Sequence, residues 1–229
     1  TTLFRSSGGW VPTQYDWYRN LLPFNNFLKF RASWGRVGND RLKDENGNDI
    51  RFPYLTTLGN VSSTWGTGLA ENRTGSMNLK WEVSTKTNFG IDARFFDDKV
   101  DMTVDFFHTK TTDIFQRRAN IPDEGGLSNV LPYANIGSMK SWGMDGTLAY
   151  THTFNKDMAL TVRGNFTHAE NEVIYWEQSG VNYPYQSNSG VPYKVQRGLI
   201  ALGLFKDEDD IKSSPKQTFM DNYRPGDIK

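Results

Sequence analysis

The fold is decided by WEVSTKTNFGIDARF at residues 81–95, the short FDD at 96–98, and KVDMTVDFFHT at 99–109. Apolar and polar residues alternate along both long arms. Because successive side chains of a strand point to opposite faces, each arm has one apolar and one polar face. A turn at 96–98 would pair Phe95 with Val100 and Phe89 with Phe106. This register keeps both faces consistent along the hairpin, whereas a slip of one residue would mix them.

Each arm is longer than the roughly 9–11 residues that a tilted membrane strand needs. The hairpin therefore suits a barrel wall in lipid, and it also suits a large soluble sheet with one covered face. The 229 residues carry 26 basic and 26 acidic side chains, which gives no indication of nucleic-acid binding. The absence of cysteine excludes disulfides, thiolate metal sites and cysteine nucleophiles. No run approaches the roughly 18 apolar residues of a membrane-spanning helix.

Further alternating segments extend this pattern along the chain. Together with the hairpin they predict strands at about 27–36, 81–95, 99–110, 139–154 and 158–168. Long polar segments predict loops at about 37–80, 111–138 and 169–229, the last with a short strand near 199–205. A helical turn is expected before Pro23, and a turn centred on Lys156 would place Phe166 opposite Gly146.

The short connections at 12–26, 96–98 and 155–157 alternate with the long loops, so short and long connections fall at opposite ends of the sheet. Outer-membrane barrels have this asymmetry, with short periplasmic turns and long extracellular loops. The predicted fold class is all-β, an antiparallel transmembrane β-barrel. The alternative is a soluble all-β carbohydrate-binding module that uses its loop aromatic residues as a platform.

Several stretches resemble one family. They are LKFRASWGRVGND at 28–40, LKWEVSTKTNFGID at 79–92, NIGSMKSWGMD at 135–145, and GLF at 203–205 followed by PGDIK at 225–229. In order and spacing they resemble the SusC/RagA-type TonB-dependent transporters of the Bacteroidetes outer membrane, over nearly the whole chain.

This resemblance implies a plugged barrel of 22 strands, a size typical of outer-membrane transporters. Residues 1–229 would be one part of that barrel domain, with the plug domain and the closing strands outside it. The resemblance also implies import of oligosaccharides or peptides across the outer membrane of a Gram-negative bacterium. The implied partners are TonB, which contacts the plug side, and a SusD-like surface lipoprotein that forms a lid.

The polar faces carry many charges, and a wet barrel wall with cross-strand pairs such as Arg94 with Asp101 explains them. A carboxylate pair such as Asp92 and Asp105 would need a cleft and one protonated partner for glycoside hydrolysis, and a sheet face with basic neighbours offers neither. We therefore expect no catalytic residue, no cofactor and no metal.

Aromatic residues in the long loops are the candidate contacts for cargo or for a lid protein. The alternative is that these rings pack the loops against one another. The candidates are Trp65, Tyr175, Trp176, Tyr183 and Tyr185.

Overall fold

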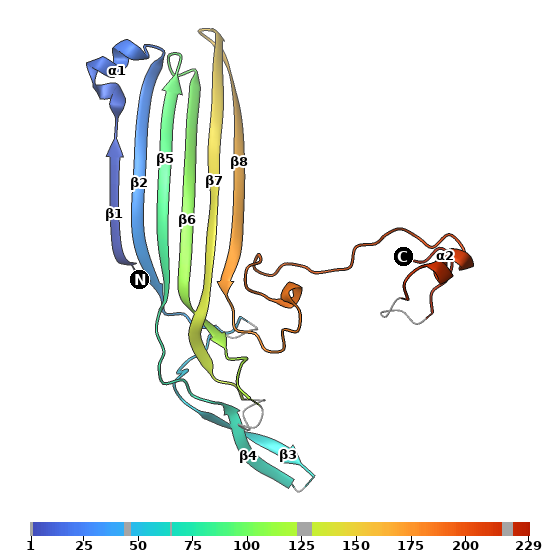
Figure 1. The fold of residues 1–229 in the computed structure, drawn as a ribbon. Coiled ribbons are helices and arrows are strands. Elements are labelled where there is room, and N and C mark those ends of the chain that lie inside the picture. Colours follow the sequence, from blue (N-terminus) through green and yellow to red (C-terminus); the bar gives the residue numbers. More distant parts are fainter. Residues whose placement is uncertain (1, 44–46, 65, 123–129, 217–221) are drawn as a thin grey trace. The chain divides into compact units, whose positions relative to one another are not determined.

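The structure is a computed structural model that describes residues 2–43, 47–64, 66–122, 130–216 and 222–229. It divides into two units, Thr1–Tyr193 and Lys194–Lys229. The first unit contains a six-stranded antiparallel sheet in the order β1-β2-β5-β6-β7-β8 (Figure 1). Its strands are β1 (Thr2–Trp10), β2 (Asn25–Asn39), β5 (Glu82–Phe95), β6 (Val100–Arg117), β7 (Tyr133–Asn155) and β8 (Met158–Tyr175). A separate hairpin pairs β3 (Thr57–Ser63) with β4 (Gly66–Arg73).

The central hairpin has the predicted register. Phe95 lies opposite Val100 and Phe89 opposite Phe106, without a bulge between them. Phe96, Asp97 and Asp98 form the turn with φ angles of 57°, 56° and 61°. Left-handed turn residues match the right-handed twist of paired strands, which is why so tight a connection can close two long arms. The turn is tied to β2, because the Asp97 N–H donates to the Asn26 side chain at 3.0 Å.

The turn end of the sheet also contains a short helical connection, as predicted before Pro23. A 3₁₀ turn, Pro12–Gln14, leads into α1 (Asp16–Leu21) between β1 and β2. The buried Asn25 side chain donates to the Tyr18 hydroxyl at 2.9 Å and fixes α1 over the start of β2. No helix in the described ranges is long and apolar enough to cross a membrane.

The strands extend further toward the loop end than alternation predicts. β2 covers Asn25–Asn39 instead of 27–36, β6 continues to Arg117, β7 begins at Tyr133 instead of 139, and β8 continues to Tyr175 instead of 168. The expected loops at 111–138 and 169–229 are therefore wrong at these ends, and the expected loop at 37–80 contains β3 and β4.

The reason is that backbone pairing continues where the apolar pattern has stopped, down to Arg117 opposite Tyr133. Stacking of the Phe115 and Tyr133 rings, at 4.8 Å between centroids and 5° between planes, supports that last pairing.

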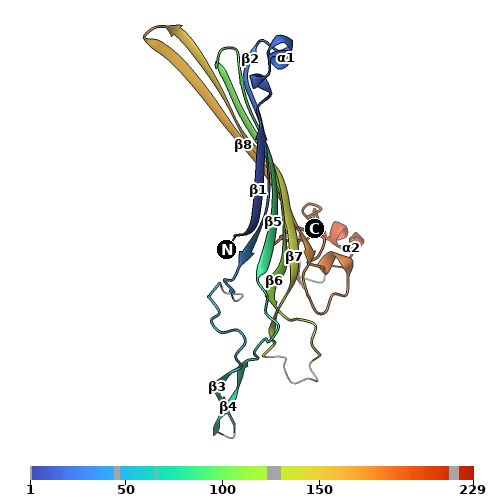
Figure 2. The same ribbon diagram turned by 90° about the vertical axis from the view of Figure 1, so that its left-hand side faces the viewer.

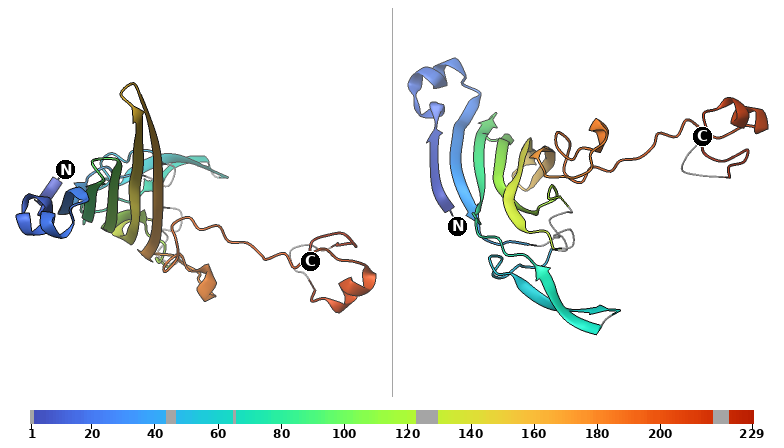
Figure 3. Two further views of the ribbon diagram at one scale, coloured as in Figure 1. Left: turned by 90° about the horizontal axis from the view of Figure 1, so that it is seen from above. Right: turned by 60° about the horizontal axis from the view of Figure 1, so that its bottom comes forward.

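The six-stranded sheet is one layer with two different faces. Figures 2 and 3 show its strands as a single twisted layer, with no second sheet or helix packed over it among the described residues of this unit. One face, which we call the apolar face, leaves large side chains 38–59% exposed: Trp34, Phe89, Phe106, Met144, Leu148, Val162 and Phe166. A soluble sheet buries such a face against another layer, and an exposed apolar surface of this extent marks contact with lipid or protein.

The second unit, Lys194–Lys229, is small. Its described part contains α2 (Glu208–Ser213) and a bridge between Leu204 and Ile228, so the short strand expected near 199–205 is wrong. Phe205 is 2% exposed and stacks on Tyr223.

The acidic stretch at 207–210 begins α2. The Asp207 carboxylate caps the helix by accepting the Asp210 N–H at 2.8 Å. The Lys229 ammonium donates to Asp210 at 2.6 Å, and this hydrogen bond lowers the pKa of the Asp210 carboxyl.

Candidate functional site

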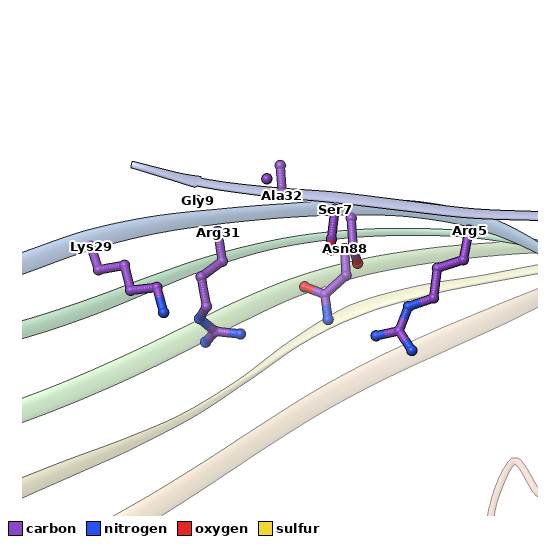
Figure 4. Close-up of a pocket in the computed structure, with 9 residues that line it drawn as sticks. Arg5, Ser7, Gly9, Lys29, Arg31, Ala32 and Asn88 are labelled. Atoms are coloured by element: carbon purple, nitrogen blue, oxygen red, sulfur yellow. The ribbon is translucent and has the colours of Figure 1, made fainter. Parts of the chain in front are cut away.

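The second face of the sheet, which we call the polar face, contains a basic pocket near β1. Figure 4 shows Arg5, Lys29, Arg31 and Asn88 reaching from β1, β2 and β5 to the same side. The pocket is completed by small residues: Ser7, Gly8, Gly9, Ala32 and Ser33. Small side chains leave the long cationic ones uncovered, so the pocket is open to whatever lies on this side of the sheet.

Arg31 is the centre of an ion-pair network that joins three strands. Its Nε and one terminal nitrogen bind both oxygens of Asp92 at 2.8 and 2.9 Å. The same terminal nitrogen contacts Asp105 at 3.0 Å. A planar guanidinium can hold two carboxylates in this forked geometry, which a lysine cannot reproduce. Arg31 thereby fixes β2, β5 and β6 against one another on the polar face.

Gly90 makes this network possible. It lies between Arg31 and Asp105 in the register, opposite both. A Cβ built on Gly90 would come within 2.7 Å of the Arg31 guanidinium carbon and 2.6 Å of an Asp105 oxygen. The guanidinium therefore crosses the bare backbone of β5 to reach Asp105.

The predicted cross-strand pair of Arg94 with Asp101 is opposite in register but does not form an ion pair. Arg94 instead lies 3.9 Å from Asp98 and over the ring of Phe27. Both partners of the Arg94–Asp98 contact are well exposed, so it contributes little to stability. The turn brings Asp98 near Arg94, and sequence alternation alone gave no sign of it.

The pocket can contact ligands through charge. Arg5 and Lys29 make no ion pair among the described residues, whereas Arg31 is neutralised by two carboxylates. The buried Asn88 side-chain oxygen has no hydrogen-bond donor in the described part of the chain. That oxygen is buried, so the pocket suits a ligand through its two unpaired cations, which favour an anionic group.

A second ionic contact joins connections at the loop end of the sheet. Glu177, whose side chain is 4% exposed, accepts from Arg118 Nε at 2.7 Å. It also accepts the backbone N–H of Asn120 at 2.9 Å. Arg118 follows β6 and Glu177 follows β8, so this contact joins the connections on the two sides of β7 at the loop end. The sequence offers no local signal for it, because the partners are far apart in the chain.

The predicted aromatic contacts separate into local groups. Trp65 lies outside the described residues. Tyr175 is the last residue of β8 instead of a loop residue and is 49% exposed. Trp176 packs against Tyr193 at 6.0 Å, so its ring helps to hold the connection that follows β8.

Tyr183 and Tyr185 stack at 5.5 Å with an angle of 10° between the rings. Tyr183 precedes a 3₁₀ turn, Pro184–Gln186, Tyr185 lies within it, and both side chains remain exposed. This pair has the geometry of an open ring surface, whereas Trp176 serves local packing.

The described residues contain no group of three or more His, Cys, Asp or Glu side chains placed to hold a metal. Asp92 and Asp105, the carboxylates considered for hydrolysis, bind the same guanidinium. Neither is therefore free to serve as a general acid. The arrangement is suited to binding and to lining a wall.

Comparison with known proteins agrees with this geometry. The family description "TonB dependent receptor-like, beta-barrel" matches residues 6–220. TonB-dependent receptor P39 of Formosa agariphila is 32% identical over 166 residues, which is 72% of this chain and 15% of that protein. TonB-dependent receptor SusC of Bacteroides thetaiotaomicron is 25% identical over 236 residues, which is 96% of this chain and 23% of SusC.

Two solved structures are similar to this chain in fold. The RagAB peptide importer in its open-open state matches 75% of this chain and 18% of its own, with a TM-score of 0.61 and 24% identity. The RagAB peptide transporter matches 74% and 18%, with a TM-score of 0.55 and 26% identity. The chain thus spans less than a quarter of the length of these relatives.

Proposed function

Because the chain belongs to the TonB-dependent receptor β-barrel family, we propose that it forms part of the wall of an importer of oligosaccharides or peptides. Barrels of this family lie in the outer membrane of Gram-negative bacteria, and so does this chain. In the proposed role the apolar face contacts lipid and the polar face lines the lumen. Short turns face the periplasm and long connections face the exterior.

The observation that carries the proposal is the single-layer sheet with its two unlike faces. Large apolar side chains stay 38–59% exposed on one side, while the Arg31 network occupies the other. A soluble carbohydrate-binding module would bury the apolar face, so the exposure of this face speaks against that alternative. An enzyme is also disfavoured, because the family consists of transporters and the carboxylates of the polar face are held by Arg31.

The proposed partners follow from the family. TonB would supply energy through a plug domain, and a SusD-like lipoprotein would close the outer side. Support for peptide cargo comes from the RagAB structures, which are described as a peptide importer and transporter. Support for oligosaccharide cargo comes from the exposed Tyr183–Tyr185 pair, since stacked rings offer flat surfaces to sugars. We place cargo or lid contacts at Tyr183 and Tyr185, and we retain Trp65, Tyr175 and Trp176 as further candidates.

The test is uptake by cells that carry the full-length gene, a deletion of it, or a deletion of tonB. Labelled oligosaccharides and labelled peptides are supplied separately. The expected result is uptake of one of the two classes, lost in both deletions and restored by the gene. Uptake of both classes at unchanged rates in either deletion would contradict the proposed function.

Double replacement of Tyr183 and Tyr185 by Ala tests the assigned contact. We expect a weaker apparent affinity for cargo with an unchanged amount of protein in the membrane. The matched control is Tyr15→Ala, an exposed tyrosine at the opposite end of the sheet. An equal loss of affinity in the control would show that the tyrosine pair makes no specific contact.

A further inference from the structure

The apolar face ends in a row of long cationic side chains at the loop end of the sheet. This basic row consists of Arg36 of β2, Lys110 of β6 and Lys140 of β7, with Thr85 of β5 between Arg36 and Lys110. The register places Arg36 opposite Thr85, Thr85 opposite Lys110, and Lys110 opposite Lys140. Alternation puts the row on the same side as the exposed apolar residues of those strands: Trp34, Phe89, Phe106 and Met144.

The basic row lies one membrane thickness away from the turns. Val100, the first residue of β6, and Lys110 are on the same face of that strand. Ten residues of strand span about 34 Å, or about 26 Å of height at a tilt of about 40°. The lipid-facing band of an outer-membrane barrel is about 25 Å tall. The row therefore lies where the hydrocarbon ends and the lipid headgroups begin.

The charges of the row are only partly neutralised by the protein. Lys110 lies directly opposite Lys140, an arrangement of like charges that destabilises a sheet unless an anion is shared. Lys140 pairs with Glu172 at 2.9 Å and lies over the Trp142 ring. Arg36 and Lys110 make no ion pair among the described residues.

The acidic residues nearby do not offset the row. Glu172 lies opposite Lys140 on β8 and ends the row, while Glu170 is occupied by His168 at 3.2 Å. Two carboxylates thus stand beside three cations, and only Lys140 is paired with one of them, so the row keeps a net positive charge.

The opposite rim of the sheet has a different composition. At the turn end, Phe24 stacks with both Phe95 and Phe96, and His152 packs between Tyr150 and Phe154. Aromatic rings suit a membrane interface of any charge, whereas a basic row suits an anionic one. On the apolar face, aromatic rings thus mark the turn end and the basic row marks the loop end.

We propose that the basic row binds the phosphate groups of the anionic glycolipid in the outer leaflet of the membrane. The inference rests on the outer-membrane location and on the proposed direction of the strands, with the long connections outside. Lys110 and Lys140 supply two point charges for one phosphate. The Arg36 guanidinium, two strands away, can bind a second phosphate oxygen pair through two N–H groups. A bound phosphate also relieves the repulsion between the two opposed lysines.

The test uses the full-length protein purified in detergent and titrated with diphosphoryl lipid A or with its dephosphorylated form. Binding is measured by native mass spectrometry. The double variant Lys110→Ala/Lys140→Ala is expected to bind diphosphoryl lipid A at least about tenfold more weakly than the wild type. Dephosphorylated lipid is expected to bind weakly and equally to both proteins.

The matched control is Lys99→Ala/Lys156→Ala, which removes two exposed lysines from the turn end. It should bind like the wild type, and Lys110→Arg/Lys140→Arg should retain binding because it keeps the charge. The inference is overturned if the Ala variant binds like the wild type, if phosphate removal has no effect, or if the control loses as much affinity.

The lipid-binding test can succeed or fail independently of the proposed import function, because lipid binding is measured without cargo. A protein that binds lipid A through the row but imports neither cargo class would refute import and leave the row's assignment standing. A protein that imports cargo but binds no phosphorylated lipid would support import and refute the assignment of the basic row.

Discussion

At the scale of single residues, the polar face depends on the missing side chain of Gly90. The Arg31 guanidinium crosses the β5 backbone at this position to reach Asp105, having already bound Asp92 on β5 itself. Arg31 also lines the pocket formed with Arg5 and Lys29.

Gly90→Ala is expected to destabilise the barrel by about 1–3 kcal/mol, because the new methyl group displaces the guanidinium and leaves Asp105 without its cation. Thermal unfolding of the full-length protein in detergent measures the effect. The matched control is Gly164→Ala on β8, where a Cβ would meet nothing within 4 Å. If both variants unfold at the wild-type temperature, the role assigned to Gly90 is wrong.

Glu177 is the second residue with a testable role, since its nearly buried carboxylate holds Arg118 and Asn120 together at the loop end. Glu177→Gln is expected to loosen the connections after β6 and β8, and to raise their rate of cleavage by added protease several-fold. Glu170→Gln, an exposed carboxylate on β8, serves as the control and should leave the rate unchanged. Equal cleavage rates in the two variants would contradict the assignment.

At the scale of elements, the strands are longer than the membrane band requires. β6 continues seven residues past Lys110 to Arg117, and β7 begins seven residues before Lys140 at Tyr133. In the proposed barrel these extensions lie beyond the lipid band, where an apolar alternation is not required, and Phe115 and Gln116 are buried there. Backbone hydrogen bonds and the Phe115–Tyr133 stack maintain the pairing there.

The α2 region gives a prediction about pH. The hydrogen bond from Lys229 lowers the pKa of Asp210, so the Asp210 carboxyl group ionises more readily in the folded unit than in the unfolded one. The hydrogen bond between Lys229 and Asp210 therefore stabilises the folded unit above the ordinary pKa of Asp, about 3.9. This stabilisation is lost as the pH falls through the lowered pKa of the folded form.

A nitroxide at Lys212, an exposed position of α2, should show increased mobility in that acidic range. In the Asp210→Asn variant the mobility should already be high at neutral pH and should change little with pH. A wild-type protein whose label mobility is constant down to pH 2 would refute the linkage.

At the scale of the whole molecule, a sheet with one exposed apolar face depends on lipid for its stability. Two neighbouring residues of β6 test this dependence, because Val104 lies on the apolar face near mid-band and Thr103 lies on the polar face. Val104→Arg is expected to destabilise the barrel by about 2–4 kcal/mol, the usual penalty for arginine at the bilayer midplane.

Thr103→Arg should have a much smaller effect, since the polar face is wet in the proposed barrel. Folding into lipid vesicles under urea titration measures both free energies in the full-length protein. Equal penalties for the two variants would mean that the faces are not divided between lipid and lumen as described.

The sequence alone determined the two faces, the register of the central hairpin, the turn at 96–98 and the placement of Phe166 opposite Gly146. These features depend on alternation and on short turns, and both are local properties of the chain. The tertiary structure alone decided how far each strand continues, which carboxylates Arg31 binds, and that Glu177 meets Arg118. It also decided that Lys110 faces Lys140. Each of these contacts joins side chains from different strands or connections, and long connections leave no periodic signal from which such neighbours can be read.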